Sequence, residues 1–311
     1  MLPIDMSAWT GRVDEAEGPR ALRWHQRVAA WSPDAPPGLA IIGFACDEGV
    51  RRNGGRVGAA AGPQALRRVL ANQAWHQTAA VYDVGDVTCP DGDQNGAHER
   101  LAGTVSAVLG AGHRPLVLGG GHESAYGTFL GLTRARPDAR IGIVNIDAHF
   151  DLRAAPIAHS GTPFAQIAEW CSANGLPFRY LCLGIAEAAN TAALFDRAAK
   201  FGAEWRFDTD LGRIAESIAE LDAFMASVDL LYLSLDLDVL PAATMPAVSA
   251  PALRGVPLET VELLLEAAAK SGKLAVAEVV EFNPSFDVDG RAARVAAGLV
   301  WRLARDWEAA R

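Results

Sequence analysis

Cysteine is scarce in this chain of 311 residues, which has four: Cys46, Cys89, Cys171 and Cys182. No two of them form a Cys-x-x-Cys pair, and none stands beside a histidine at the spacing of a metal ligand. These absences argue against a disulfide-stapled secreted scaffold and against the common thiolate metal sites. We expect the four thiols to be reduced and mostly buried, as in a cytoplasmic protein.

Long apolar segments and an excess of positive charge are also lacking. No apolar run approaches the roughly 20 residues that span a bilayer, and the acidic N-terminal stretch lacks the apolar centre of a signal peptide. Lys and Arg number 28 against 37 Asp and Glu, which gives a formal net charge of −9. We therefore expect neither nucleic acid nor a membrane as a partner, and a location in the cytoplasm.

What the chain has instead is an alternation of apolar runs and helical patterns, without repeats or linkers. We predict one domain over residues 1–311, of the α/β class with a mostly parallel central sheet. The strands are continuous apolar runs, which is typical of strands buried on both faces. We predict strands at residues 39–45, 79–84, 115–118, 141–146, 178–183, 230–235 and 274–280. We predict helices at residues 63–71, 97–109, 124–132, 163–170, 191–199, 214–225, 258–269 and 291–305.

Two long segments break this alternation and are expected to be functional loops. Residues 46–62 hold five glycines and the side chains of Arg51, Arg52 and Arg56. Residues 241–257 hold four prolines. Loops at strand ends are where α/β proteins place binding and catalytic residues.

Acidic and histidine side chains directly follow three of the predicted strands. Gly-Gly-Gly-His-Glu occupies 119–123, Asp147-x-His149-x-Asp151 follows residue 146, and Asp236-x-Asp238 follows residue 235. The carboxyl ends of parallel strands meet at one edge of a sheet, so these groups can converge. In an extended backbone, side chains two and four residues apart share a face. Carboxylate and imidazole together suit a divalent ion such as Mn, Fe, Co or Zn.

This inventory of four aspartates and two histidines predicts a site for two divalent cations with a bridging water or hydroxide. Burying four acids close together without cations would be costly. Asp147 and Asp236 are the predicted bridging carboxylates. His122 and Asp151 would complete the coordination of one ion, and His149 and Asp238 that of the other. The predicted metal ligands are thus His122, Asp147, His149, Asp151, Asp236 and Asp238.

With these segments in view, the sequence resembles the ureohydrolase (arginase–agmatinase) family. The matching segments are Gly-Gly-Gly-His-Glu at 119–123, Asp-Ala-His-Phe-Asp at 147–151, Ser-Leu-Asp-Leu-Asp at 234–238 and Glu-Phe-Asn-Pro at 281–284. The resemblance implies a three-layer α/β/α fold of the arginase type with a mostly parallel central sheet. It also implies two Mn²⁺ ions, hydrolysis of the C–N bond of a guanidine or amidine, and a homo-oligomer.

Further segments are similar to the formimidoylglutamase subgroup of that family. They include Gly-Phe-Ala-Cys-Asp-Glu-Gly-Val-Arg-Arg-Asn at 43–53, Ser-Gly-Thr-Pro-Phe at 160–164 and Leu-Asp-Val-Leu-Pro at 237–241. The implied reaction is hydrolysis of N-formimidoyl-L-glutamate, a small-molecule substrate, to L-glutamate and formamide, a step of histidine degradation. Two alternatives stay open: hydrolysis of a guanidino acid such as guanidinobutyrate, and a metal-binding protein of the same fold without activity. The physiological metal also stays open.

The resemblance and the chemistry of a dicarboxylic amidine together suggest the catalytic and substrate-binding residues. Glu281 matches the family's substrate-facing glutamate and would hold the amidine by a charge-assisted hydrogen bond. Asp238 would carry a proton to the leaving amine. Arg153, two residues after Asp151, would bind a carboxylate bidentately.

Other candidates lie in neighbouring loops. Arg51 and Arg56 are further candidates for binding the substrate's carboxylates. The alternative is that they form ion pairs with neighbouring acidic residues. Asn190 lies near the position where arginases place an acid for the substrate amine, and is a further candidate contact. Arginases carry a histidine where Ser160 stands in this chain, and His159 is one residue earlier. His159 is therefore a candidate proton shuttle, with a solvated loop residue as the alternative.

Overall fold

The computed structural model describes residues 4–308, and its centre is a nine-stranded sheet. The strands lie in the order β1-β3-β2-β4-β9-β8-β5-β6-β7, and every pairing between them is parallel. Their bounds are β1 Ala29–Ala30, β2 Gly38–Ala45, β3 Ala80–Thr88, β4 Arg114–Gly119, β5 Ile141–Ile146, β6 Tyr180–Ile185, β7 Glu204–Phe207, β8 Leu230–Asp236 and β9 Leu274–Val280.

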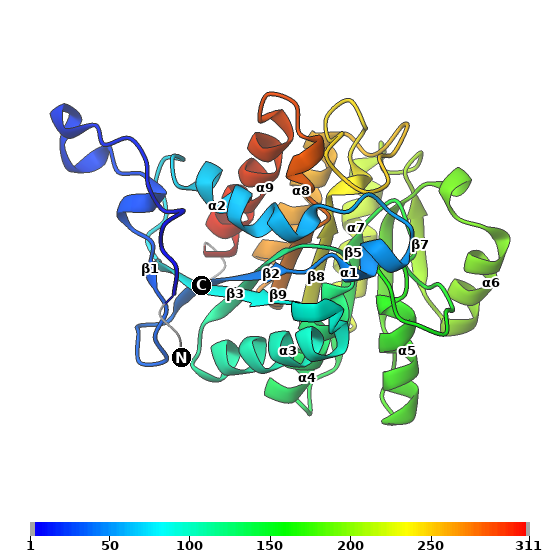
Figure 1. The fold of residues 1–311 in the computed structure, drawn as a ribbon. Coiled ribbons are helices and arrows are strands. Elements are labelled where there is room, and N and C mark those ends of the chain that lie inside the picture. The colour runs from blue at the N-terminus through cyan, green and yellow to red at the C-terminus, as the bar shows by residue number, and fades with distance from the viewer. Residues whose placement is uncertain (1–3, 309–311) are drawn as a thin grey trace.

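Helices cover both faces of the sheet and make three layers. In Figure 1, α2, α8 and α9 lie on one side of the sheet, and α3, α4 and α5 lie on the other. Apolar residues of α7 belong to the first of these two cores, and those of α6 belong to the second. The bounds are α1 Glu48–Arg52, α2 Gly62–Leu70, α3 Gln94–Gly110, α4 Ser124–Ala135, α5 Pro163–Ala173, α6 Ala192–Phe201, α7 Ile214–Ala226, α8 Leu258–Lys270 and α9 Arg291–Glu308.

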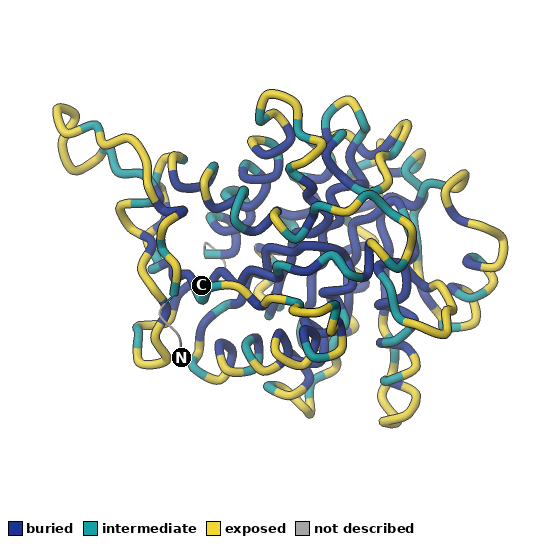
Figure 2. The backbone as a smooth tube through the Cα atoms, in the orientation of Figure 1, coloured by how far each residue is buried: buried dark blue, intermediate teal, exposed yellow. Residues whose placement is uncertain are grey.

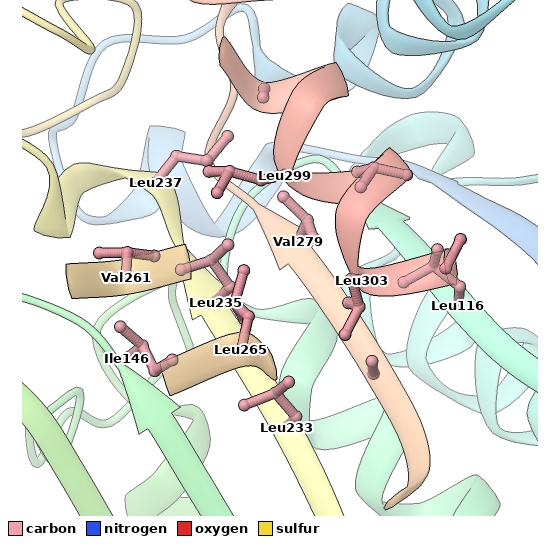
Figure 3. Packing of buried hydrophobic residues seen from close by; sticks show 14 of the residues in the cluster. Leu116, Ile146, Leu233, Leu235, Leu237, Val261, Leu265, Val279, Leu299 and Leu303 are labelled. Atoms are coloured by element: carbon pink, nitrogen blue, oxygen red, sulfur yellow. The ribbon is translucent and has the colours of Figure 1, made fainter. Parts of the chain in front are cut away.

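The central strands are buried on both faces, as their continuous apolar sequences predict. Figure 2 shows the interior of the molecule as buried chain, with exposed residues on loops and outer helix turns. In Figure 3, Val261 and Leu265 of α8 and Leu299 of α9 lie over Leu235 of β8 and Val279 of β9. Each such side chain contributes about 1.5–3 kcal/mol of transfer free energy. This packing holds the central strands rigidly, so that their ends can place side chains reproducibly.

Local signals in the sequence set several helix ends. Pro63 is the second residue of α2, where its missing N–H costs no helical hydrogen bond. The Asp93 side chain accepts a hydrogen bond from the backbone N–H of Gly96 and caps α3. Gly202 ends α6 with φ +70°, a conformation that favours glycine.

The structure confirms the predicted α/β class and three-layer arrangement, and differs at a few elements. The prediction missed β7, a short, partly exposed edge strand without a continuous apolar run. It also missed the two-residue β1 and the single turn of α1, which lies inside the glycine-rich segment 46–62. The strand predicted at 79–84 extends to Thr88. Among the described residues, no helix combines the length and apolar composition needed to cross a membrane.

Candidate metal centre

The predicted metal ligands follow strands that are neighbours in the middle of the sheet. In the order β4-β9-β8-β5, His122 lies just after β4, Asp236 ends β8, and Asp147 follows β5 directly. Glu281 follows β9, between the strands that carry His122 and Asp236. Since all four strands are parallel, their carboxyl ends form one edge, where ligands gather in open α/β sheets.

The glycines after β4 let the chain pass close to the end of β2. The N–H of Gly120 donates to the carbonyl oxygen of Phe44 at 2.7 Å. A Cβ atom on Gly120 would stand 1.8 Å from the carbonyl oxygen of Cys46. The carbonyl of Gly120 in turn accepts from the N–H of Glu281. A side chain at residue 120 would therefore push apart two loops of the site.

The six predicted ligands form two groups. Nδ1 of His122 lies 3.3 Å from an oxygen of Asp147, 3.1 Å from one of Asp151 and 3.0 Å from one of Asp236. Within this group the potential ligand atoms lie within 4.8 Å of one another.

The second group consists of Asp147, His149 and Asp238. Nδ1 of His149 lies 3.0 Å from an oxygen of Asp238 and 3.5 Å from the second oxygen of Asp147. Asp147 thus belongs to both groups through different oxygens, the geometry of a bridging carboxylate. Asp236 belongs only to the first group, so its bridging role stays a prediction.

One geometric expectation was wrong. The backbone from Asp147 to Asp151 is not an extended strand, because Asp151 has a φ of +48° in the left-handed region. As a result Asp151 faces His122, whereas His149 faces Asp238. The turn at Asp151 therefore distributes one short segment over both groups.

The electrostatics of these groups fit cations better than protons. Burial lowers the pKa of His122 and His149, but the surrounding carboxylates outweigh it and raise both. Burial and neighbouring carboxylates raise the pKa of Asp236 strongly, and burial raises that of Asp238 to about 7. Burial acts to raise the pKa of Asp147, but the imidazoles of His122 and His149 on its two sides outweigh burial and lower it.

Unsatisfied polar atoms point to the same conclusion. Nδ1 of His122 and Oδ1 of Asp238 are buried and have no hydrogen-bond partner among the described residues. Buried carboxylates that repel one another are stabilised by divalent cations, and imidazole nitrogen with carboxylate oxygen suits ions of intermediate hardness. The donor set therefore fits two divalent metal ions.

A buried carboxylate behind His122 sets the tautomer of this histidine. Ser234 Oγ lies 2.8 Å from His122 Nε2 and 2.9 Å from an oxygen of Glu278. The Ser234 hydroxyl has a single proton and donates it to Glu278. Ser234 must then accept from Nε2–H of His122. Nε2 is therefore the nitrogen that keeps its proton, and Nδ1 is the nitrogen that can release its proton to bind a metal.

The sequence prediction did not assign roles to Ser234 or Glu278. The Glu278 carboxylate also accepts from Thr128 at 2.9 Å, from Ser124 at 3.2 Å and from Tyr232. All of these groups are buried. Their signal in the sequence is Tyr232 and Ser234 two apart in the apolar strand β8, and the single acid Glu278 in the apolar strand β9. Serine and threonine also stand four apart at the start of α4. That pattern indicates a buried polar network without identifying what it supports.

Glu281 lies beside the first group in a strained backbone conformation, with φ +69°. One carboxylate oxygen accepts from the backbone N–H of His122 at 2.8 Å, and the other is buried without a hydrogen-bond partner among the described residues. Burial and the neighbouring acids Asp236 and Glu123 raise its pKa well above the usual range. The free oxygen is available to a cationic group, and an amidine role for Glu281 stays a prediction.

Asn190 holds the backbone of the segment that carries the predicted ligands Asp147 and His149. Its amide nitrogen donates to the carbonyls of Ala148 and Ala186, both at 2.9 Å, and its oxygen accepts from the N–H of Phe150. These bonds tie the loop after β5 to the loop after β6. The contacts favour a positioning role for Asn190 over direct substrate binding.

Arg56 and Arg51 have partners inside the protein. The Arg56 guanidinium donates to the carbonyls of Pro246, Val248 and Ser249, and so holds the proline-rich segment 241–257. Arg51 donates to both carboxylate oxygens of Glu48 and is largely exposed. These contacts favour the competing structural roles, and substrate binding by either arginine stays a prediction.

Arg153 and His159 lie together beside the loop that carries Asp151. The backbone of Arg153 donates to the carbonyl of Gly161, and its guanidinium has no hydrogen bond or ion pair with a described residue. Nδ1 of His159 accepts from the N–H of Gly161 at 3.1 Å, and burial lowers the pKa of the ring. Asp151 interacts electrostatically with His159. Both side chains therefore remain candidates for the predicted substrate and proton-transfer roles.

The chain is similar to known proteins over nearly its whole length. The sequence model of the arginase family matches residues 37–305. The formimidoylglutamase of Chromobacterium violaceum is 61% identical over 304 residues, covering 97% of this chain and 98% of that protein. The formimidoylglutamase of Aeromonas hydrophila is 55% identical over 307 residues, with 97% and 98% covered.

Solved structures are also similar to this chain over most of its length. Trypanosoma cruzi formiminoglutamase with Mn²⁺ superposes with a TM-score of 0.80 at 28% identity, covering 88% of this chain and 94% of that one. Bacillus subtilis formimidoylglutamase has the same fold, with a TM-score of 0.86 at 22% identity and 96% and 94% covered.

Proposed function

Because this chain belongs to the arginase family, we propose that it is a binuclear metal hydrolase that converts N-formimidoyl-L-glutamate and water into L-glutamate and formamide. The observation that carries the proposal is the pair of ligand groups that share Asp147 at the carboxyl edge of the sheet. Relatives 61% and 55% identical are formimidoylglutamases, which supports the choice of substrate within the family.

Two Mn²⁺ ions are the cofactors we propose, by analogy with the Trypanosoma cruzi enzyme. The first would be held by His122, Asp147, Asp151 and Asp236, and the second by Asp147, His149 and Asp238. Such a pair would lower the pKa of a bound water and supply hydroxide at neutral pH.

The protein's own residues then orient the substrate and move a proton. The free oxygen of Glu281 accepts a hydrogen bond from the cationic amidine and holds its carbon at the site. Oδ1 of Asp238 has no other hydrogen bond among the described residues, so it accepts a proton from the attacking water. That proton passes to the departing glutamate amine, which leaves poorly without one. Arg153 binds a carboxylate of the substrate with a guanidinium that has no competing partner among the described residues.

We further propose that the reaction is a step of histidine degradation and takes place in the cytoplasm. The four cysteines are unpaired thiols, and three of them are buried, which is typical of a reducing compartment. A homo-oligomer is proposed from the family resemblance alone. Light scattering on the purified protein measures its mass directly.

A substrate panel tests the proposed reaction. Mn²⁺-loaded protein is given N-formimidoyl-L-glutamate and guanidinobutyrate, while formamide, urea and ammonia are measured. We expect formamide from the first compound and two metal ions per chain. Urea from the guanidino acid, with N-formimidoyl-L-glutamate left intact, would refute the proposed substrate. Turnover retained in a His149→Ala variant would refute the two-metal site.

A further inference from the structure

A cavity of about 540 Å³ opens beside the metal ligand His149. Its walls come from the loops after β5, β6 and β7 and from residues 250–255 of the proline-rich segment. Cavities of roughly 300–1,000 Å³ are typical of small-molecule sites. Because His149 forms part of the wall, a molecule in this cavity lies next to the second ligand group.

The backbone on both sides of the cavity is fixed. On one side, Asn190 ties the carbonyls of Ala148 and Ala186 together. On the other side, the N–H of Ala242 donates to the carbonyl of Ala252, and the N–H of Val256 donates to the carbonyl of Val239. These two bonds flank residues 253–255.

Gly255 allows this flanking segment to turn tightly. It has φ +62°, and a Cβ atom there would stand 2.4 Å from the backbone nitrogen of Pro241. The main chain at Arg254, its neighbour, is therefore anchored on both sides, and the residue itself is exposed.

Arg254 is the cationic side chain of this wall. Among the described residues that line the cavity, it is the one lysine or arginine. It is exposed, and no described residue forms a hydrogen bond or ion pair with its guanidinium. Glu187 and Asp208 also line the cavity, but neither forms an ion pair with Arg254. The guanidinium is thus available to an anion in the cavity.

We propose that this cavity holds the glutamyl part of the substrate and that Arg254 binds its side-chain carboxylate, an inference that rests on the proposed function. The substrate has two carboxylates. The α-carboxylate is attached to the carbon that bears the scissile nitrogen, so it stays near the metal ligands, where Arg153 follows Asp151 by two residues. The second carboxylate ends a chain of two methylene groups and needs a separate cation.

The rest of the cavity suits those methylene groups. Small apolar side chains, including Ala148, Ala189 and Ala252, line it together with His149 and Arg254. An arginine fits a carboxylate through two parallel hydrogen bonds, which a lysine cannot reproduce. Arg153 and Arg254 together would therefore select a dicarboxylic amidine over one with a single acid group.

Steady-state kinetics of Arg254→Gln and Arg254→Lys test this role. With N-formimidoyl-L-glutamate, we expect Arg254→Gln to raise KM about tenfold or more while kcat changes within about twofold. Arg254→Lys should recover part of the loss. Arg68→Gln, which removes an exposed arginine from α2, is the matched control and should leave KM unchanged.

Two truncated substrates identify the carboxylate. N-formimidoyl-2-aminobutyrate lacks the side-chain carboxylate, so Arg254→Gln should have the same KM for it as the unsubstituted enzyme. N-formimidoyl-4-aminobutyrate lacks the α-carboxylate, and on it the KM defect should persist. A defect of equal size on both compounds, or one confined to the first, would overturn the assignment.

A binding measurement separates this inference from the proposed function. Calorimetric titration with L-glutamate should give a dissociation constant at least several-fold weaker for Arg254→Gln than for Arg68→Gln. Normal hydrolysis of N-formimidoyl-L-glutamate by the parent enzyme, with KM and glutamate affinity unchanged in Arg254→Gln, overturns the inference alone. No hydrolysis by the parent enzyme overturns the proposed function, and this inference with it.

Discussion

Replacing Ser234 by alanine should weaken metal binding without touching a metal ligand. Ser234 accepts a hydrogen bond from Nε2–H of His122 and donates one to Glu278. In the Ser234→Ala variant Nε2–H loses its acceptor, because the nearest oxygen of Glu278 is 3.9 Å away. The ring is then free to rotate or to carry its proton on Nδ1, the nitrogen that faces the three aspartates.

The expected size of the effect follows from the role of such partners. Loss of a hydrogen bond behind a metal-binding histidine costs about 10–100-fold in metal affinity. This corresponds to about 1.4–2.8 kcal/mol of binding free energy. The His122 pocket is fully buried, so solvent does not replace the missing hydroxyl readily.

Ser124→Ala is the matched control. Ser124 donates to the same Glu278 carboxylate at 3.2 Å and is equally buried, but it forms no hydrogen bond with His122. Without metal, Ser124→Ala should lose about 1 kcal/mol of stability from one missing hydrogen bond, and Ser234→Ala about 2 kcal/mol from two. Titration of chelator-treated protein with Mn²⁺ in a calorimeter measures the affinities. Equal affinity losses in the two variants, or none in Ser234→Ala, would refute the proposed control of the His122 tautomer.

Three further predictions follow from other parts of the structure. Gly120→Ala should lower the unfolding free energy by about 1–3 kcal/mol, because the new Cβ overlaps the carbonyl of Cys46; an unchanged melting temperature would contradict this. Burial lowers the pKa of His98 to about 4, so between pH 6.5 and 4 the unfolded chain binds a proton that the folded protein does not. Stability should therefore fall as pH decreases through this window, by roughly 3 kcal/mol at most. Urea unfolding at several pH values in this window should show that the unfolding free energy of His98→Phe falls less with decreasing pH than that of the parent protein. An equal fall would exclude His98 as the source. Arg153→Ala should raise KM for N-formimidoyl-L-glutamate with little change in kcat, and an unchanged KM would remove Arg153 from the site.

The sequence was sufficient for most of the fold because its signals are local. Continuous apolar runs identified the seven long strands, and β5 and β9 have the predicted bounds. Edge strand β7 was missed because a short, half-exposed strand carries no such run. The order of the strands depends on contacts between distant segments, and no local pattern encodes it.

The candidate site, like the fold, was predictable from the sequence only in part. The candidate metal ligands were evident from their spacing after strands, and the structure brings His122, Asp147 and Asp238 together with the other predicted ligands in two groups. Which aspartate is shared depends on backbone turns such as the one at Asp151. Spacing alone could not predict that turn, because an aspartate seldom adopts a positive φ.

The roles of the arginines required the tertiary structure. In the sequence, Arg56 and Arg153 were both plausible carboxylate ligands, and Arg254 drew no attention. The fold places three carbonyls of residues 241–257 around the Arg56 guanidinium, whereas Arg153 and Arg254 have no partner among the described residues. The sequence by itself determined which side chains could bind metal, since that depends on chemistry and short-range spacing. Only the tertiary structure decided which cations remain available to substrate, because an arginine is available only when no distant segment supplies it with an acceptor.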